Sequence, residues 1–244
     1  MNGKIPFVIL SGGRGTRMGA LAERYRCKSL IPIGGSPALE WVLRALTFAF
    51  RERARVILCI ERTELLPAMQ ELRANAGDMN VEIYFNPSLK GTMHALYLLR
   101  DTLLQEEQVF VLYGHQPIHP QHLIRMNEER ERAIVSLYPT SSNVSRKISV
   151  VNREGEIIEF LQGGSEKGLT TNEYYLDVPY LLPVNFVRIM QDEYVRSHDA
   201  VEQWLQAGNP VHGHVANFPH EFHYPHEIES VREFTETLRS DLTA

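Results

Sequence analysis

Hydrophobic positions in the first 115 residues alternate between short apolar runs and longer segments whose apolar residues are spaced three and four apart. The short runs are rich in β-branched and aromatic residues and predict strands at residues 7–10, 55–60, 81–85 and 109–113. The longer segments predict amphipathic helices at residues 38–50, 64–74 and 93–104. This alternation is typical of βαβ units with a mainly parallel sheet.

The pattern changes from residue 133 onward, where short strands follow one another without intervening helical periodicity. Strands are predicted at residues 133–138, 147–151, 156–160 and 180–182. The sequence Asn-Arg-Glu-Gly at 152–155 predicts a hairpin turn, and we therefore expect a small antiparallel excursion within residues 140–185. No Pro-rich or Ser-rich linker interrupts the chain, which favours one domain over residues 1–244.

Composition narrows the class of protein. The chain is 43% hydrophobic and 23% charged, which is ordinary for a protein with a sizeable core. Its net charge is -5 and it has no strongly basic stretch, so a nucleic-acid partner is not expected. The apolar run of residues 5–10 ends at Ser-Gly-Gly before it could form a signal peptide or a membrane span, so we expect a cytoplasmic protein with no membrane partner.

The first candidate for chemistry is the segment 10–19, which reads LSGGRGTRMG. An apolar strand runs directly into three glycines within four residues and then into a helix-compatible stretch. Glycine allows successive backbone N–H groups to converge on an anion, and two arginines add positive charge beside a helix start. The segment lacks the Gly-Lys-Ser/Thr of a Walker A loop and the third glycine of a dinucleotide fingerprint. It therefore predicts a phosphate-binding loop of another type.

Residues 27–37, shortly after the glycine loop, carry further motifs. This segment reads CKSLIPIGGSP, with a lysine eleven residues after Arg17 and the pattern Leu-x-Pro-x-Gly-x-x-Pro just before a predicted helix. Together with Gly-Gly-x-Gly-Thr-Arg-Met, this order resembles the sugar nucleotidyltransferase superfamily, which includes sugar-1-phosphate nucleotidyltransferases and phosphocholine cytidylyltransferases. Two later segments resemble the same family: KGTMHAL at 90–96 and VLYG at 111–114.

The resemblance implies a fold and a reaction. The fold is a Rossmann-like mixed, mainly parallel sheet flanked by helices, of the nucleotide-diphospho-sugar transferase type. Residues 1–115 would form a nucleotide-binding half and residues 116–244 an acceptor-binding half. The protein would be an enzyme that moves a nucleoside monophosphate from a nucleoside triphosphate to a phosphorylated small molecule, such as a sugar phosphate, and releases pyrophosphate. Many relatives assemble, so a homo-oligomer is possible.

The resemblance also assigns roles to individual residues. Arg17 would hold the departing pyrophosphate and Lys28 would stabilise charge around the α-phosphate, as the two catalytic residues. The nucleotide would be bound by Leu10, Gly12, Gly13, Arg14, Gly15, Gly91 and Thr92, and Thr92 could also cap the helix that follows it. The acceptor would be bound by Lys167 and Asp177.

The sequence departs from the family where the metal ligands are expected. The family has an aspartate after the glycine that ends the fourth strand, whereas this chain has Gly-His-Gln-Pro at 114–117, which places His115 there. Near the C-terminus the second aspartate position falls on His223, in the segment 221–228 that reads EFHYPHEI. Magnesium prefers oxygen ligands, whereas neutral imidazole suits softer ions, so two such changes weaken a magnesium site.

Three explanations remain open. His115 and His223 face each other and bind a softer divalent metal ion in an active transferase. Alternatively, magnesium arrives on the triphosphate and the histidines hydrogen-bond the phosphates directly. In the third, the chain is a catalytically silent homologue that binds nucleotide or nucleotide-sugar in a regulatory or partner role.

Overall fold

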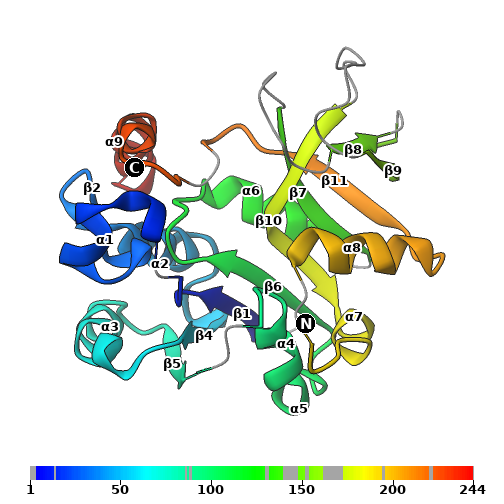
Figure 1. The fold of residues 1–244 in the computed structure, drawn as a ribbon, viewed down its shortest axis with the longest axis horizontal. Helices are drawn as coiled ribbons and strands as arrows, with labels where there is room; N and C mark the ends of the chain where they lie inside the picture. The colour runs from blue at the N-terminus through cyan, green and yellow to red at the C-terminus, as the bar shows by residue number, and fades with distance from the viewer. Residues whose placement is uncertain are drawn as a thin grey trace. The chain divides into compact units, whose positions relative to one another are not determined.

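The computed structural model describes residues 4–13, 15–85, 87, 90–129, 132–139, 148–151, 154–161, 173–193, 196–219 and 222–243. The chain divides into two compact units. The first unit consists of Met1–Leu89, Val109–Arg125 and Phe218–Ala244, and the second of Lys90–Gln108 and Met126–Asn217. Each is described by itself, with the elements labelled in Figure 1. The expectation of one domain with two halves stays a prediction.

The first unit is built on parallel strands in the order β6-β1-β4-β5. Their bounds are β1 Ile5–Leu10, β4 Ala54–Ile60, β5 Asn80–Phe85 and β6 Gln108–Tyr113. The strands β1, β4 and β6 are buried on both faces, as continuous apolar runs such as VILCI require. In the core, the rings of Phe7 and Phe110 stack with centroids 4.8 Å apart, and Phe50 lies 5.1 Å from Phe7.

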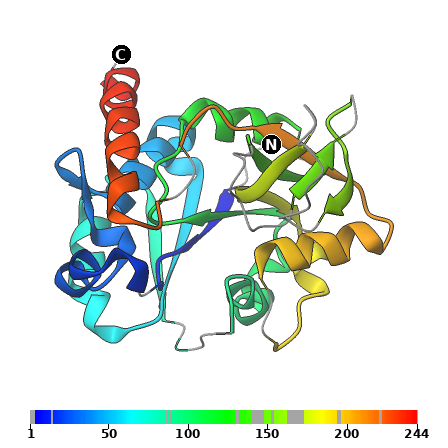
Figure 2. The ribbon, with the colours of Figure 1, turned by 45° about the horizontal axis from the view of Figure 1, so that its top comes forward.

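The helices with residues in this unit include α2 Ala38–Phe50, α3 Leu66–Ala74, α6 Pro120–Glu128 and α9 Ile228–Thr243. Helix α2 contacts β4, and α3 contacts β5. In α2, eight of thirteen residues are buried, among them Trp41, whose indole N–H donates to the Ile33 carbonyl at 2.8 Å. Helix α9 contacts α2 and the short strand β2 Pro32–Ile33, which pairs with β3 Ser36–Pro37. Figure 2 shows α9 running beside α2.

The second unit has a mixed sheet. Its strands are β7 Ala133–Pro139, β8 Ile148–Val151, β9 Ile157–Leu161, β10 Glu173–Pro183 and β11 Val211–Val215. Strand β11 runs parallel to β7, whereas the pairs β7–β10, β8–β10 and β8–β9 are antiparallel. Its helices are α4 His94–Leu98, α5 Arg100–Leu103, α7 Val184–Arg188 and α8 Ser197–Gln206.

The predicted fold class is confirmed: parallel strands are flanked by helices, and antiparallel pairs join β7 to β10, β10 to β8 and β8 to β9, beside the short antiparallel pair β2–β3. Two predicted elements differ. The helix expected at 93–104 is broken at Leu99 into α4 and α5, and β10 begins at Glu173 instead of residue 180. Strand β11 was not predicted, because VHGHV combines a glycine with two histidines and lacks a strand-like apolar run. Residues 152 and 153 of the expected hairpin turn lie outside the described residues.

Among the described residues, no helix combines the length and the apolar character that crossing a membrane requires.

Candidate functional site

The glycine loop lies directly after β1, at the carboxyl end of the parallel strands of the first unit. Open αβ sheets bind ligands at this edge. Gly13 is exposed, and nothing lies within 4 Å of the position that a Cβ would occupy there. Arg17 is exposed in the 3₁₀ turn Thr16–Met18, with its guanidinium 5.8 Å from the centre of the Tyr224 ring. Arg14 lies outside the described residues.

Position 15 requires glycine for two reasons, its left-handed backbone and the closeness of Lys28. Its φ is +63° and its ψ is 32°, the left-handed conformation that glycine adopts without strain. A Cβ at this position would lie 2.5 Å from Cγ of Lys28. The absence of a side chain at Gly15 therefore lets the stem of Lys28 pass directly beneath the loop.

Lys28 begins the 3₁₀ turn Lys28–Leu30 and is 8% exposed, which is unusual for a lysine. Its ammonium nitrogen lies 3.5 Å from Nδ1 of His223 and 5.4 Å from the centre of the Phe222 ring. The preceding Cys27 thiol donates to the Ser11 carbonyl at 3.0 Å, and burial raises the pKa of that thiol, which keeps its proton. This bond ties the lysine segment to the end of β1.

The end of β6 approaches the end of β1 closely. The Gly114 N–H donates to the Leu10 carbonyl at 3.0 Å, and a Cβ on Gly114 would lie 2.0 Å from Oγ of Ser11. His115 follows immediately. Its ring stacks on Tyr113 at 5.2 Å between centroids and meets Phe222 edge-on at 5.8 Å.

The segment 222–227 brings His223 to the same place. Partial burial disfavours the charge of Glu227, but its carboxylate accepts the backbone N–H groups of His223 and Tyr224, the latter at 2.9 Å. These two bonds lower the pKa of Glu227 below its ordinary value, so the turn that presents His223 is held by an ionised carboxylate.

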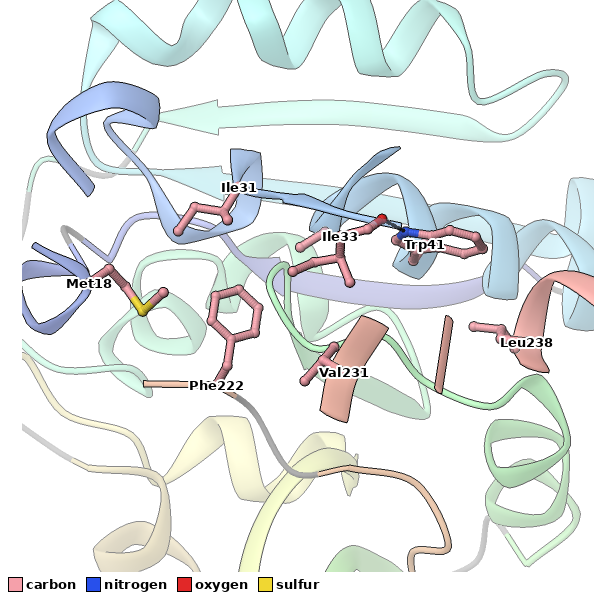
Figure 3. Close-up of a cluster of buried hydrophobic side chains, with 8 residues drawn as sticks. Met18, Ile31, Ile33, Trp41, Phe222, Val231 and Leu238 are labelled. Carbon is pink, nitrogen blue, oxygen red and sulfur yellow. Dashed lines mark hydrogen bonds between the residues drawn. The ribbon is translucent and has the colours of Figure 1, made fainter. Parts of the chain in front are cut away.

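One buried hydrophobic cluster holds together the segments that carry Arg17, Lys28 and His223, and Figure 3 shows its side chains. Met18 comes from the glycine-loop turn, Ile31 follows the lysine turn, and Phe222 precedes His223. All three side chains are at most 1% exposed and pack in one cluster with residues of α2 and α9. The positions of Arg17, Lys28 and His223 are therefore fixed by one shared core.

The structure thus brings together the residues predicted from three distant parts of the sequence. Lys28 lies against Gly15 of the glycine loop, and its ammonium lies near His223 and the Phe222 ring. His115 contacts the same Phe222 ring. No group of three or more His, Cys, Asp or Glu side chains that could hold a metal ion exists among the described residues.

The remaining predicted residues belong to the second unit. Gly91 has φ +83° and precedes α4, whose N-cap is Met93 without a side-chain hydrogen bond, so the expectation that Thr92 caps this helix is wrong. The helix begins one residue too late for the Thr92 hydroxyl to serve as its cap. Asp177 is buried and accepts the Val178 N–H at 2.8 Å. Lys167 lies outside the described residues.

An anchored loop surrounds Gly91. Asp192 accepts from the Lys90 ammonium at 2.5 Å and contacts Nε2 of the buried His94 at 2.7 Å. The hydrogen bonds from Lys90 and His94 lower the pKa of Asp192. The loop that the sequence assigns to nucleotide binding is therefore clamped at both ends by one carboxylate.

Sequence reasoning missed two carboxylates of the first unit. Glu61 follows β4 directly, and its Cγ would lie 2.2 Å from a Cβ on Gly12, so it borders the glycine loop. Its position at the carboxyl end of a predicted parallel strand was the available signal. Glu227 lies three residues after Tyr224 at the start of a helix, the spacing of a capping box.

The fold and this site define a nucleotide-binding αβ transferase domain. The family model of the MobA-like NTP transferase domain matches residues 7–220, and the chain therefore belongs to that family. The prediction of a nucleotidyltransferase domain is confirmed.

Curated relatives align with between half and most of this chain. The bifunctional protein GlmU of Thermotoga maritima is 27% identical over 126 residues, which cover 51% of this chain and 25% of GlmU. GlmU of Buchnera aphidicola subsp. Acyrthosiphon pisum is 23% identical over 161 residues, 65% of this chain and 33% of that protein. A 2-aminoethylphosphonate cytidylyltransferase of Lancefieldella rimae is 23% identical over 226 residues, 93% of this chain and 86% of the relative. The chain thus spans about a quarter to a third of the GlmU proteins that it matches.

Proposed function

We propose that the protein transfers a nucleoside monophosphate from a nucleoside triphosphate to a phosphorylated small molecule and releases pyrophosphate. The observation that carries this proposal is the packing of the largely buried Lys28, whose stem lies against Gly15 of the glycine loop and whose ammonium lies 3.5 Å from His223. A largely buried lysine next to a glycine loop favours a polyphosphate over an uncharged ligand.

The reaction needs positioning and charge neutralisation more than covalent chemistry. A phosphate oxygen of the acceptor attacks the α-phosphorus in line, a new O–P bond forms, and the bond from the α-phosphorus to the bridging oxygen breaks. Lys28 stabilises negative charge on the α-phosphate, and Arg17 holds the pyrophosphate that leaves with the electron pair. The exposed backbone at Gly13 supplies further N–H groups to the phosphates.

The acceptor-binding role belongs to Asp177 and Lys167 in this proposal, and nucleotide binding is completed by Gly91 and Thr92. The name of the Lancefieldella rimae relative specifies a cytidylyl group and a phosphonate acceptor. CTP and 2-aminoethylphosphonate therefore enter the test beside the other triphosphates, sugar 1-phosphates and phosphocholine.

Pyrophosphate release is measured for each pair of triphosphate and acceptor, with magnesium, manganese, zinc or iron present. For the active pair, Arg17→Ala should lower kcat/KM by about 10²–10³-fold, the effect of removing one charge-stabilising group. Arg24→Ala is the matched control, because Arg24 is also exposed and lies 5.2 Å from a tyrosine ring, on α1 Ala20–Tyr25 beyond the loop.

A silent nucleotide-binding homologue is the second candidate, and the histidines at 115 and 223 favour it. Pyrophosphate release from no pair, together with calorimetric binding of a triphosphate, would establish this alternative and exclude transfer.

A further inference from the structure

We infer that this site binds polyphosphate through the protein's own cations and ring N–H groups, and that His115 and His223 do not form a divalent-cation site. The inference rests on the proposed function for the identity of the ligand as a nucleoside triphosphate. Binding of polyphosphate without a metal ion is tested independently of nucleotidyl transfer.

The contact between Lys28 and His223 opposes a metal ion at His223. An ammonium has three donors and no acceptor, so the Nδ1 lone pair of His223 accepts from Lys28 across 3.5 Å. A metal ion at Nδ1 would need the same lone pair and would stand next to a positive charge. The side chain of Lys28 is held in place, because its stem is buried against Gly15 and its ammonium lies 5.4 Å from the centre of the Phe222 ring.

The same contact fixes the tautomer of neutral His223. When Nδ1 accepts, the proton of a neutral imidazole is on Nε2, which is then a donor. The Nε2–H group can donate a hydrogen bond to a phosphate oxygen, but it has no lone pair with which to coordinate a metal ion. His223 therefore suits an anion at the position where the resemblance places a cation-binding carboxylate.

The neighbours of His115 and the nearby carboxylates also argue against a magnesium site. The ring of His115 borders aromatic groups, Tyr113 at 5.2 Å and Phe222 at 5.8 Å, and magnesium needs several oxygen ligands. The Glu227 carboxylate accepts two backbone N–H groups of its own turn. Glu61, the described carboxylate beside the loop, lies against Gly12.

Inorganic pyrophosphate is the probe, and binding is measured by calorimetry in EDTA and again in magnesium. The wild-type protein should bind it in EDTA with a Kd within about threefold of the value in magnesium. The variant His115→Asp with His223→Asp should bind it at least tenfold more weakly in EDTA and regain affinity with magnesium. His198→Asp, a single substitution of the same type on α8 of the second unit, is the control and should resemble the wild type.

Lys28→Met keeps the buried stem and removes the charge, so it should weaken pyrophosphate binding at least tenfold in both buffers. Thermal unfolding confirms that each variant is folded, and Lys28→Gln replaces Lys28→Met if that variant unfolds. The phosphate-free protein is also titrated with Mn²⁺, followed by electron paramagnetic resonance, and with Zn²⁺, followed by calorimetry. Neither ion should bind at the histidines.

Two results would overturn the inference: binding of Zn²⁺ or Mn²⁺ by the phosphate-free protein that His223→Ala abolishes, or loss of pyrophosphate binding in EDTA. Neither result depends on turnover. Failure of nucleotidyl transfer with intact pyrophosphate binding in EDTA would remove the proposed function and leave the metal-free site standing.

Discussion

Replacing Gly15 with alanine tests how the glycine loop positions Lys28. The left-handed backbone, with φ +63°, costs an alanine about 1–2 kcal/mol. The new Cβ would lie 2.5 Å from Cγ of Lys28, whereas carbon atoms pack at about 3.5–4.0 Å. The lysine stem must therefore move by about 1 Å, and a displacement of this size at a reacting centre lowers rates by about 10²-fold.

Gly77→Ala is the matched control, since Gly77 has φ +65° and nothing lies within 4 Å of its added Cβ. Both variants should lose about 1–2 kcal/mol of unfolding free energy in urea titrations from the backbone, and Gly15→Ala should lose more. In addition, Gly15→Ala should lower kcat/KM about 100-fold or weaken pyrophosphate binding, whereas Gly77→Ala should leave both unchanged.

A double-mutant cycle separates the two costs of Gly15→Ala. In a Lys28→Ala background the nearest remaining neighbour of the added Cβ is Cγ of Met18 at 3.7 Å, an ordinary contact. There Gly15→Ala should cost no more than Gly77→Ala. Equal stability and equal pyrophosphate affinity of Gly15→Ala and Gly77→Ala in the otherwise wild-type protein would refute the reasoning.

Three further changes test the supports of the site. Phe222→Ala removes a fully buried ring and should lower the unfolding free energy by about 3–5 kcal/mol in urea, whereas Phe48→Ala, at a side chain 42% exposed, should change it by about 0.5 kcal/mol or less; equal losses would contradict the packing role. Glu227→Gln should destabilise the protein at neutral pH, and because the pKa of Glu227 is lowered in the folded state, this difference should be complete above its ordinary value of 4.5 and vanish as the pH falls through the lowered pKa. A difference that grows in acid would show the opposite sign. Asp192→Asn should speed amide hydrogen exchange in residues 90–94 with little change in melting temperature, and unaltered exchange there would show that the carboxylate does not hold the loop.

Local sequence signals were sufficient to predict the parallel strands β1, β4, β5 and β6 and the position of the glycine loop. The strand 55–60 and the helix 38–50 are defined by their own apolar periodicity, and the structure has them as β4 and α2 within a residue. The need for glycine at position 15 also follows from the motif. These features depend on neighbours within a few residues, which the printed sequence contains.

The contacts that decide the chemistry are not local. Lys28 and His223 are 195 residues apart, and their approach depends on a cluster that joins Met18, Ile31 and Phe222. No periodicity links these positions, so the sequence predicted two histidines near one another but not the ammonium beside one of them. Asp192 and His94, 98 residues apart, were missed for the same reason.

The first unit is discontinuous in the chain, and this has a consequence for the order in which it assembles. Strands β1, β4 and β5 pair within residues 5–85, but Phe222 reaches the cluster only after residues 126–217 have been made. Contacts of such long sequence separation form late, because chain entropy must be lost before they contribute. We therefore expect the glycine loop and Lys28 to come together before His223 joins them, which happens only when α9 docks on α2.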